Sequence, residues 1–195
     1  IIATGASPRK LEIEGAREFM GRGVSYCATC DGFFYSGKNV VVLGGGNSAL
    51  NDALYLADLA KNVKIVYRKS AFTRAEAVLR ERVEARDNIE CLFNTDLAKI
   101  AAKPDSQDGE LIITTTDGDQ IVADGLFVAI GHEANTDYLT EDVKRDALGR
   151  IAPDALPAGM YVAGDVHSEL KMQIATAVGT GCSAGMDAIL YLNKN

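Results

Sequence analysis

Residues 40–43 are four apolar side chains, three of them valines, and three glycines follow at positions 44–46. A short continuous apolar run of this kind is typical of a strand that is buried on both faces. The residues after the glycines carry apolar side chains at the helical spacing i, i+3, i+4 and i+7, namely Leu50, Ala53, Leu54 and Ala57. A buried strand that passes through glycines into a helix constrains the chain to a layered strand and helix architecture.

This alternation of strand and helix is repeated once. Residues 63–67 form a second strand pattern, and helical spacing follows in Ala75, Val78, Leu79 and Val83. Short connections between such elements imply right-handed strand–helix–strand units and a parallel sheet. From residue 89 to residue 129 the pattern changes to short strands with Asp-Gly turn signals at 108–109 and 117–118, which predicts an antiparallel ribbon. The expected fold class is α/β.

The glycine loop has the form G-x-G-x-x-A and lies between the expected strand and helix. This is the dinucleotide-binding fingerprint in the context that it requires, and it predicts a Rossmann-like domain. The first glycine permits a tight turn, the second lets the backbone approach a pyrophosphate at the helix N-terminus, and the alanine keeps helix and strand close. The predicted nucleotide residues are Gly44, Gly46, Asn47, Ser48 and Ala49. A glycine-rich turn in a nucleotide-free domain is the alternative interpretation.

Cations follow the second expected strand. An NAD site would place Asp or Glu there to bind the ribose hydroxyls, whereas this strand ends at Tyr67 and is followed by Arg68, Lys69 and Arg74. Two or three cations suit a 2′-phosphate, so NADPH is favoured over NADH. A solvated charge cluster at a helix start is the plainer interpretation of such residues, and their place after the strand is what favours the nucleotide.

Cys27 and Cys30 form a C-x-x-C pattern that spaces two thiols one helical turn apart. At that spacing the sulfurs can form a redox disulfide, and the helix start favours the thiolate of the first. Asp31 can act as general acid or base and protonate a leaving thiolate, or can simply be a first-turn charge favoured by the helix dipole. A zinc site would need a second ligand pair, and the only histidines, His132 and His167, are isolated, so no metal is expected.

Composition excludes several classes of protein. With 47% hydrophobic and 24% charged residues among 195, the chain can bury a core. Its net charge of −7 and dispersed basic residues argue against nucleic acid as a partner. No apolar run is long enough for a membrane span, and no basic-then-apolar leader opens the sequence. The remaining cysteines, Cys91 and Cys182, stand alone in apolar stretches, so a reducing, cytoplasmic location is predicted.

These motifs resemble one family, the low-molecular-weight thioredoxin reductases of bacterial type. The segments that carry the resemblance occur in that family's order: ATG at 3–5, CATCDG at 27–32, GGGNSA at 44–49, GD at 164–165 and GTGC at 179–182. The CATCDG segment just upstream of a nucleotide fingerprint is highly specific. The resemblance covers essentially the whole chain.

The resemblance implies a flavoenzyme that passes hydride from NADPH to FAD and then to the Cys27/Cys30 disulfide, after which the dithiol reduces a thioredoxin or thioredoxin-like protein. Cys27 would attack the partner disulfide, Cys30 would face the flavin, and Asp31 would supply the proton. Further cofactor contacts are expected at Thr4, Gly5, Gly131, Gly164, Asp165, Gln173, Ile174 and Ala175. Members of this family are usually homodimers.

The resemblance also divides the chain. Residues 1–7 would end an FAD-binding domain, residues 8–134 would form the NADPH-binding domain with its C-x-x-C, and residues 135–195 would be the C-terminal part of the FAD-binding domain. The family's N-terminal FAD lobe would precede Ile1, so poor or absent FAD binding is expected of these residues alone. The two domains would rotate about hinges near residues 7–10 and 131–136.

Two departures from the family's pattern bear on the cofactors. The basic motif usually reads His-Arg-Arg with an Arg directly after Phe, whereas here residues 67–69 read Tyr-Arg-Lys and Thr73 separates Phe72 from Arg74. Where the family usually has Arg-Gln-Ala beside the flavin, residues 172–174 read Met-Gln-Ile. The NADPH preference and the flavin contacts are therefore inferred from position.

Three other functions stay open on the sequence. The flavoprotein component of alkyl hydroperoxide reductase shares these motifs and carries an extra N-terminal thioredoxin-like module. Relatives that accept electrons from ferredoxin, or that lack a known donor, tend to lose the basic motif, and the presence of Arg68 and Lys69 argues against them. An inactive nucleotide-binding fragment is the non-enzymatic alternative.

Overall fold

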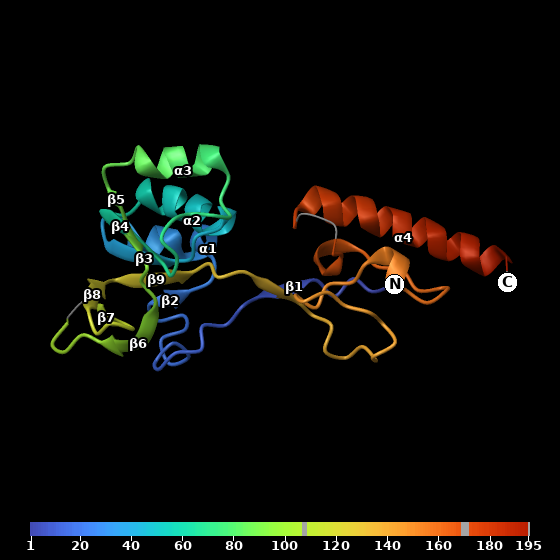
Figure 1. Ribbon diagram of the computed structural model, residues 1–195, viewed down its shortest axis with the longest axis horizontal. Helices are drawn as coiled ribbons and strands as arrows, with labels where there is room; N and C mark the ends of the chain where they lie inside the picture. The colour runs from blue at the N-terminus through green and yellow to red at the C-terminus, as the bar shows by residue number, and fades with distance from the viewer. Residues whose placement is uncertain (107–108, 169–171, 195) are drawn as a thin grey trace. The chain divides into compact units, whose positions relative to one another are not determined.

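The computed structural model describes residues 1–106, 109–168 and 172–194, which form two compact units (Figure 1). Unit 1 comprises Ile1–Arg9 and His132–Asn195, and unit 2 comprises Lys10–Gly131. Unit 2 has two sheets and two buried clusters, and unit 1 has one sheet and one cluster, so the units are described separately.

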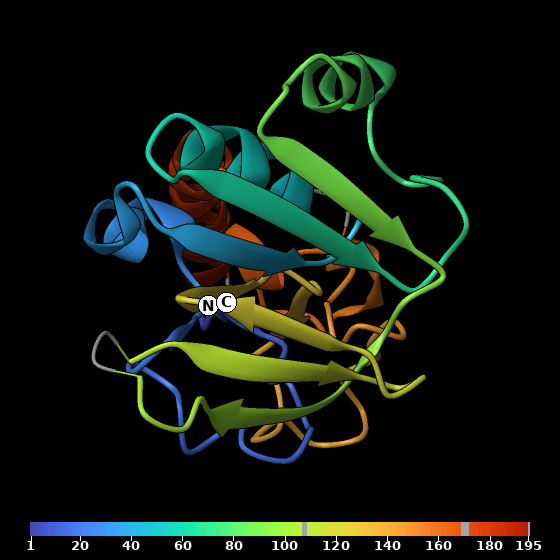
Figure 2. The same ribbon diagram turned by 90° about the vertical axis from the view of Figure 1, so that its left-hand side faces the viewer.

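Unit 2 is built on a five-stranded sheet with the order β2–β9–β3–β4–β5. Its strands are β2 (Val24–Ser25), β3 (Asn39–Leu43), β4 (Asn62–Tyr67), β5 (Ile89–Phe93) and β9 (Gly125–Val128). All neighbouring strands are parallel, and Figure 2 shows β3, β4 and β5 side by side in blue, teal and green. The central strand β3 continues into the glycine loop, as the sequence pattern predicts.

Both faces of this sheet are covered, which explains the continuous apolar run of β3. Val40 and Val42 face the helix α2 (Asn47–Ala57), whose Leu50, Ala53 and Leu54 belong to the same buried cluster. Val41 and Leu43 face the other way and pack with the three-stranded antiparallel ribbon. Figure 1 shows α2 and the helix α3 (Ala77–Glu84) on one side of the sheet and the ribbon on the other.

The ribbon consists of β6 (Leu97–Ala102), β7 (Leu111–Thr115) and β8 (Gln120–Ala123), paired antiparallel. The strands β7 and β8 are joined through Gly118, whose φ of +93° suits glycine and agrees with the Asp117-Gly118 turn signal. The other turn signal, at 108–109, includes Asp108, which lies outside the described residues. The expected α/β class with a parallel sheet and an antiparallel ribbon is confirmed.

The redox motif lies on two short helices, α1 (Ala28–Asp31) and η1 (Gly32–Tyr35), that pack against α2. Gly32 makes this contact possible, because a Cβ at that position would lie 2.9 Å from the Tyr55 ring and 3.1 Å from Leu56. The short strand β2 precedes α1 and pairs with β9, with Val24 opposite Leu126 and Ser25 opposite Phe127. The sheet therefore fixes the start of the redox segment.

Unit 1 contains the two-stranded antiparallel sheet of β1 (Ala6–Pro8) and β10 (His132–Ala134), the short helices η2 (Pro153–Ala155) and η3 (Gly164–Val166), and the long helix α4 (Ile174–Lys194). Its core is a cluster of six buried residues, Ile2, Ala134, Val143, Ile151, Val162 and Val166. The sequence-based boundaries put Pro8 and residues 132–134 in the nucleotide domain. The pairing of β1 with β10 places them in unit 1 instead, because a sheet holds both strands together.

In the described part of the chain, no helix is both long enough and apolar enough to span a bilayer.

Candidate active site

Cys27 and Cys30 are joined by a disulfide, with their Cα atoms 5.3 Å apart. Cys27 is the N-cap residue of α1, and its Sγ accepts a hydrogen bond from the backbone N–H of Cys30 at 3.2 Å. Cys30 is exposed and Cys27 is half-buried. The two cysteines predicted as a redox pair are therefore bonded to each other at a place that solvent reaches.

The Asp31 carboxylate has a side-chain partner that the sequence patterns did not reveal. Its Oδ2 accepts a hydrogen bond of 2.6 Å from the hydroxyl of Ser25, which is buried on β2. Burial, and after it the carboxylates of Asp31 and Asp124, raise the pKa of the nearby Tyr35 hydroxyl. The raised pKa keeps the Tyr35 hydroxyl a neutral phenol at neutral pH.

Three aromatic residues follow the redox motif, and the structure separates them by role. The Tyr35 ring packs edge to face on Phe127, with ring centroids 5.2 Å apart. Phe33 and Phe34 instead stand 74% and 72% exposed on η1. Two large apolar side chains left in water beside a disulfide are typical of a surface that another protein covers. Sequence reasoning did not single them out, because a run of aromatics predicts burial as readily as exposure.

The glycine loop lies at the carboxyl end of β3, and its three glycines meet different constraints. Gly44 has a φ of +143°, and a Cβ there would lie 2.3 Å from the carbonyl oxygen of Ala129 and 3.0 Å from the Cβ of Ala49. At Gly46 a Cβ would meet nothing within 4 Å. No side chain caps α2, so its first backbone N–H groups are open to an anion over Gly46.

Gly45 is required for a reason that the fingerprint does not state. A Cβ at this position would lie 2.5 Å from the ring of Tyr67, the last residue of β4. Tyr67 stacks on Phe72 with centroids 5.8 Å apart, and Phe72 in turn packs edge to face on Phe93 at 4.9 Å. This aromatic column supports the glycine loop and the basic segment together.

The basic segment follows β4 on the same edge of the sheet as the glycine loop, since Leu43 pairs with Val66. Phe72 is buried and anchors the segment, while Arg68, Lys69 and Arg74 are exposed. None of the ion pairs formed within the described ranges uses these three cations. The structure therefore brings the predicted pyrophosphate and 2′-phosphate residues to neighbouring strand ends.

Asn47 has a structural partner in addition to its predicted nucleotide role. Its side-chain Oδ1 accepts from the backbone N–H of Glu76 at 2.8 Å, and its Nδ2 donates to the Glu76 carboxylate at 2.9 Å. Glu76 is the N-cap residue of α3. The Asn47 side chain therefore connects the start of α2 to the start of α3, and its backbone N–H is not used in these two bonds.

The other predicted cofactor residues fall outside this loop. Gly131, with a φ of +110°, ends unit 2. In unit 1 the Thr4 hydroxyl donates to the Asn135 carbonyl oxygen at 2.7 Å, next to Gly5. The N–H of Gly164 donates to the Thr180 hydroxyl of α4 at 3.0 Å, which places η3 beside the helix.

Asp165 lies on η3, and residues 173–175 are exposed at the start of α4. Their roles stay predictions.

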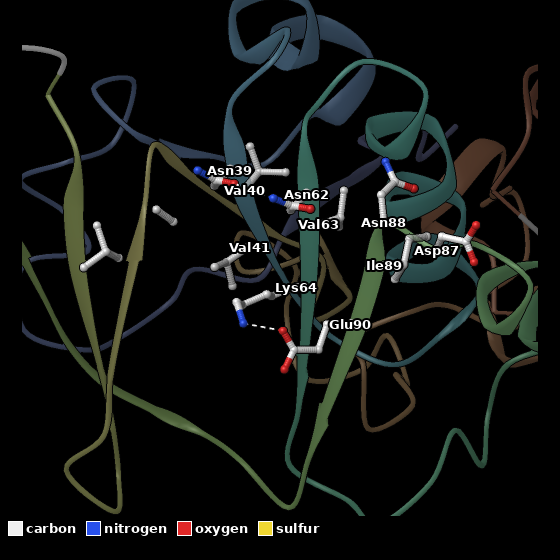
Figure 3. Close-up of a pocket in the computed structure, with 12 residues that line it drawn as sticks. Asn39, Val40, Val41, Asn62, Val63, Lys64, Asp87, Asn88, Ile89 and Glu90 are labelled. Carbon is white, nitrogen blue, oxygen red and sulfur yellow. Dashed lines mark hydrogen bonds and ion pairs between the residues drawn. The ribbon is translucent and has the colours of Figure 1, made fainter.

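A cavity of about 390 Å³ lies at the amino ends of β3, β4 and β5 (Figure 3). Asn39, Asn62 and Asn88 line it, and an ion pair between Lys64 and Glu90 crosses from β4 to β5. Because the glycine loop follows the carboxyl end of β3, this cavity lies at the opposite edge of the sheet and does not belong to the predicted nucleotide site.

Residues 1–181 match the family described as pyridine nucleotide-disulphide oxidoreductase, and the chain belongs to this family. Among curated proteins, the thioredoxin reductase of Rickettsia conorii is 39% identical over 203 residues, covering 100% of this chain and 65% of the relative. The solved structure of Lactococcus lactis thioredoxin reductase matches with a TM-score of 0.80 at 30% identity, over 100% of this chain and 66% of that one. The resemblance to thioredoxin reductases predicted from the motifs is confirmed.

Similarity alone does not fix the reaction. The glucosaminate ammonia-lyase of Pseudomonas fluorescens is 37% identical over 99% of this chain and 64% of its own length. The chain spans about 65% of the length of the curated relatives it matches. The activity therefore depends on the residues at the site.

Proposed function

We propose that this chain carries the disulfide and nucleotide part of an NADPH-dependent thioredoxin reductase, in which electrons pass through FAD to Cys27/Cys30 and then to a thioredoxin-like protein. The observation that carries the proposal is the solvent-reachable disulfide at the N-cap of α1, in the same unit as an uncapped glycine loop. The family, which unites a pyridine nucleotide with disulfide chemistry, supports it. A cytoplasmic location and a homodimer belong to the same proposal.

The residues at the carboxyl edge of the sheet fit NADPH. The open N-H groups at the start of α2 would hold the pyrophosphate, and Gly46 leaves room for it. Arg68, Lys69 and Arg74 would bind the 2′-phosphate through charge-assisted hydrogen bonds. The absence of an acidic residue directly after β4 favours NADPH over NADH.

Unit 1 would hold part of the FAD. Gly5 and Gly164 have φ values of +69° and +74°, which let the backbone turn closely around a ligand, and the exposed residues 173–175 lie at the start of α4 near η3. When bound, the two cofactors supply a hydride and relay its electron pair to the disulfide.

The residues of this chain can then complete the exchange. The Cys27 thiol loses its proton to solvent, the resulting thiolate attacks the disulfide of the partner protein, and one partner sulfur leaves as a thiolate. Asp31, which takes up a proton from solvent, gives it to that thiolate. The Cys30 thiol then gives up its proton as its sulfur attacks Cys27 Sγ, which restores the Cys27–Cys30 disulfide, and the partner's second sulfur leaves and takes up that proton to become a thiol. Two electrons and two protons pass to the partner.

The surface around the disulfide fits a protein substrate. Phe33 and Phe34 are exposed on η1, directly after the helix that carries Cys30. A small disulfide would gain nothing from them, whereas a protein could bury both rings on docking.

The dithiol step can be tested on the chain as it stands, reduced with dithiothreitol and freed of the reductant. The reduced chain should convert a bacterial thioredoxin from disulfide to dithiol, and Cys30→Ser should stop at a mixed disulfide on Cys27. Cys182→Ser, which removes an exposed cysteine of α4, is the matched control and should react normally. Normal thioredoxin reduction by Cys30→Ser would refute the assigned pair.

The nucleotide step has an independent test by calorimetric titration. NADPH should bind more tightly than NADH, and Arg68→Ala with Lys69→Ala should weaken NADPH by about tenfold or more while changing NADH little. Equal affinity for the two nucleotides, or none, would refute the NADPH assignment and favour the ferredoxin-linked or donor-unknown relatives.

A further inference from the structure

Ser25, Cys27 and Asp31 close a ring of hydrogen bonds beside the disulfide. The backbone N–H of Cys27 donates to the Ser25 hydroxyl at 3.1 Å, and the Ser25 hydroxyl donates to Asp31 Oδ2 at 2.6 Å. The ring is completed by the backbone N–H of Asp31, which donates to the carbonyl oxygen of Cys27 at 3.1 Å. Both backbone polar groups of Cys27 are therefore engaged with the two residues of this ring.

The Ser25 hydroxyl is suited to hold a carboxylate in one place. It is only 6% exposed, and it belongs to β2, which pairs with β9 of the main sheet. A hydroxyl has a single proton, and its second possible acceptor, the Cys27 carbonyl oxygen, is 3.4 Å away against 2.6 Å for Asp31. The proton therefore goes to Asp31, in a short bond typical of a charged acceptor.

The geometry leaves the other carboxylate oxygen free. Ser25 is the one side chain found to donate to Asp31 within the described ranges, and it uses Oδ2. Asp31 Oδ1 is thus left to exchange a proton, while Oδ2 fixes the rotamer. A buried donor that fixes an acid in this way reduces the conformational freedom that must be lost at the moment of proton transfer.

We propose that Ser25 is a positioning residue for thiol–disulfide exchange, which holds the Asp31 carboxylate and the Cys27 backbone in the arrangement that proton transfer to a leaving thiolate needs. This inference rests on the proposed dithiol chemistry of Cys27 and Cys30. It assigns a role to a residue that the motif CATCDG does not include, two positions before the first cysteine.

A leaving-group comparison distinguishes this role from a structural one. Glutathione disulfide releases a basic thiolate that needs a proton, whereas dithiobis-nitrobenzoate releases an acidic thiol that leaves as the anion. Loss of proton transfer should therefore slow the first reaction and spare the second. Loss of the local fold, or of the exposed thiol, would slow both.

The variants are Ser25→Ala, Ser25→Thr, Asp31→Asn and the double variant Ser25→Ala/Asp31→Asn. Thr115→Ala is the matched control, because Thr115 is 4% exposed and its hydroxyl accepts from the N–H of Asp119 on the ribbon, away from the cysteines. Reduced chain is mixed with either disulfide, and oxidation is followed by the mass of the tryptic peptide of residues 23–38, which contains Cys27 and Cys30 alone of the four cysteines.

With glutathione disulfide, Asp31→Asn should slow oxidation by about a hundredfold and Ser25→Ala by about tenfold, within the range of general acid–base effects. Both variants should react with dithiobis-nitrobenzoate within about twofold of the unmodified chain, since that leaving group needs no proton. Ser25→Thr, which keeps the hydroxyl, should restore the rate, and Ser25→Ala should add little to Asp31→Asn because the two act as a unit.

Three results would each overturn the role of Ser25. The first is equal slowing with both disulfides, and the second is full additivity in the double variant. The third is a Ser25→Thr variant whose rate is not restored although its far-ultraviolet circular dichroism spectrum stays native. Those results leave the proposed function standing as long as the unmodified chain reduces thioredoxin. Failure of the unmodified chain to reduce thioredoxin would instead refute the proposed function, and it is measured separately.

Discussion

Unit 2 and unit 1 bury their apolar residues in different ways. In unit 2 the parallel sheet has a cluster on each face, and α2 alone contributes six buried residues. In unit 1 the longest helix, α4, has one buried residue, Ala184, among its described positions, while Ile174, Val178 and Leu192 are 85%, 67% and 73% exposed. A helix between sheet and solvent needs one apolar stripe, whereas α4 is apolar on several sides.

This difference indicates which contacts stabilise each unit. Unit 2 can hold its disulfide and glycine loop rigidly because covered strands position both. Unit 1 relies on a cluster of six residues under loops and on polar contacts such as Gly164 to Thr180. The same substitution should therefore cost much in α2 and little in α4.

The largest contrast is expected from one leucine in each unit. Leu50 of α2 is 0% exposed, and Leu50→Ala should lower the free energy of unfolding of unit 2 by about 3 kcal/mol, from lost burial and the cavity left behind. Leu190→Ala in α4, at 54% exposed, should cost about 0.5 kcal/mol or less. Urea unfolding followed by circular dichroism measures both. Similar losses in the two variants would remove the contrast.

A smaller loss of stability is expected in the glycine loop of unit 2, where the backbone packs closely against Tyr67. Gly45→Ala places a Cβ against the Tyr67 ring, so the loop or the aromatic column must shift, at a cost of about 2 kcal/mol. Gly46→Ala is the matched control, because nothing lies within 4 Å of its Cβ, and the free protein should be nearly as stable as before. NADPH titration should show weaker binding by both variants. Normal stability of Gly45→Ala would contradict the close contact with Tyr67.

The core of unit 1 can be probed with a gentler change. Ile151 is 0% exposed and lies in the cluster beneath the loops. Ile151→Val should cost about 1 kcal/mol, as expected for one buried methylene group. Intrinsic tyrosine fluorescence and amide exchange resolved by residue should place this loss in unit 1 alone. Equal loss of protection in β3 and β4 would show that the two units unfold as one.

Asp52 tests whether a half-buried carboxyl group of unit 2 favours or opposes folding. Burial raises the pKa of this α2 carboxyl to about 6 from 3.8. The folded protein holds the proton more tightly than the unfolded chain, so ionisation opposes folding increasingly as pH rises from about 4 to about 6. Asp52→Asn should raise the free energy of unfolding by about 1 kcal/mol at pH 7, after allowance for partial exposure, and by almost nothing near pH 4. An equal gain at both pH values would argue against the carboxyl charge as the cause.

The redox and nucleotide motifs show which parts of the structure local sequence patterns can predict. The run of residues 40–43 and the glycine loop predicted the buried strand and the helix after it, because both depend on side chains that are neighbours in sequence. The C-x-x-C predicted a bonded pair for the same reason. The strands β1 and β2 carry no such pattern, since three and two residues are too few for a periodic signal.

What the amino-acid sequence determined by itself is the α/β class, the parallel strand–helix units and the membership of a family, because alternation, glycine positions and spacing are local properties. The tertiary structure alone decided which partner each side chain meets. Ser25 lies six residues before Asp31, and the pairing of β2 with β9, about a hundred residues further along the chain, fixes its position in the sheet. Asn47 meets Glu76 and Gly45 meets Tyr67 because parallel strands bring successive loops to one edge of the sheet. The contacts of Asn47 and Gly45 join residues that are far apart in the sequence through the packing of the sheet, and no local pattern encodes them.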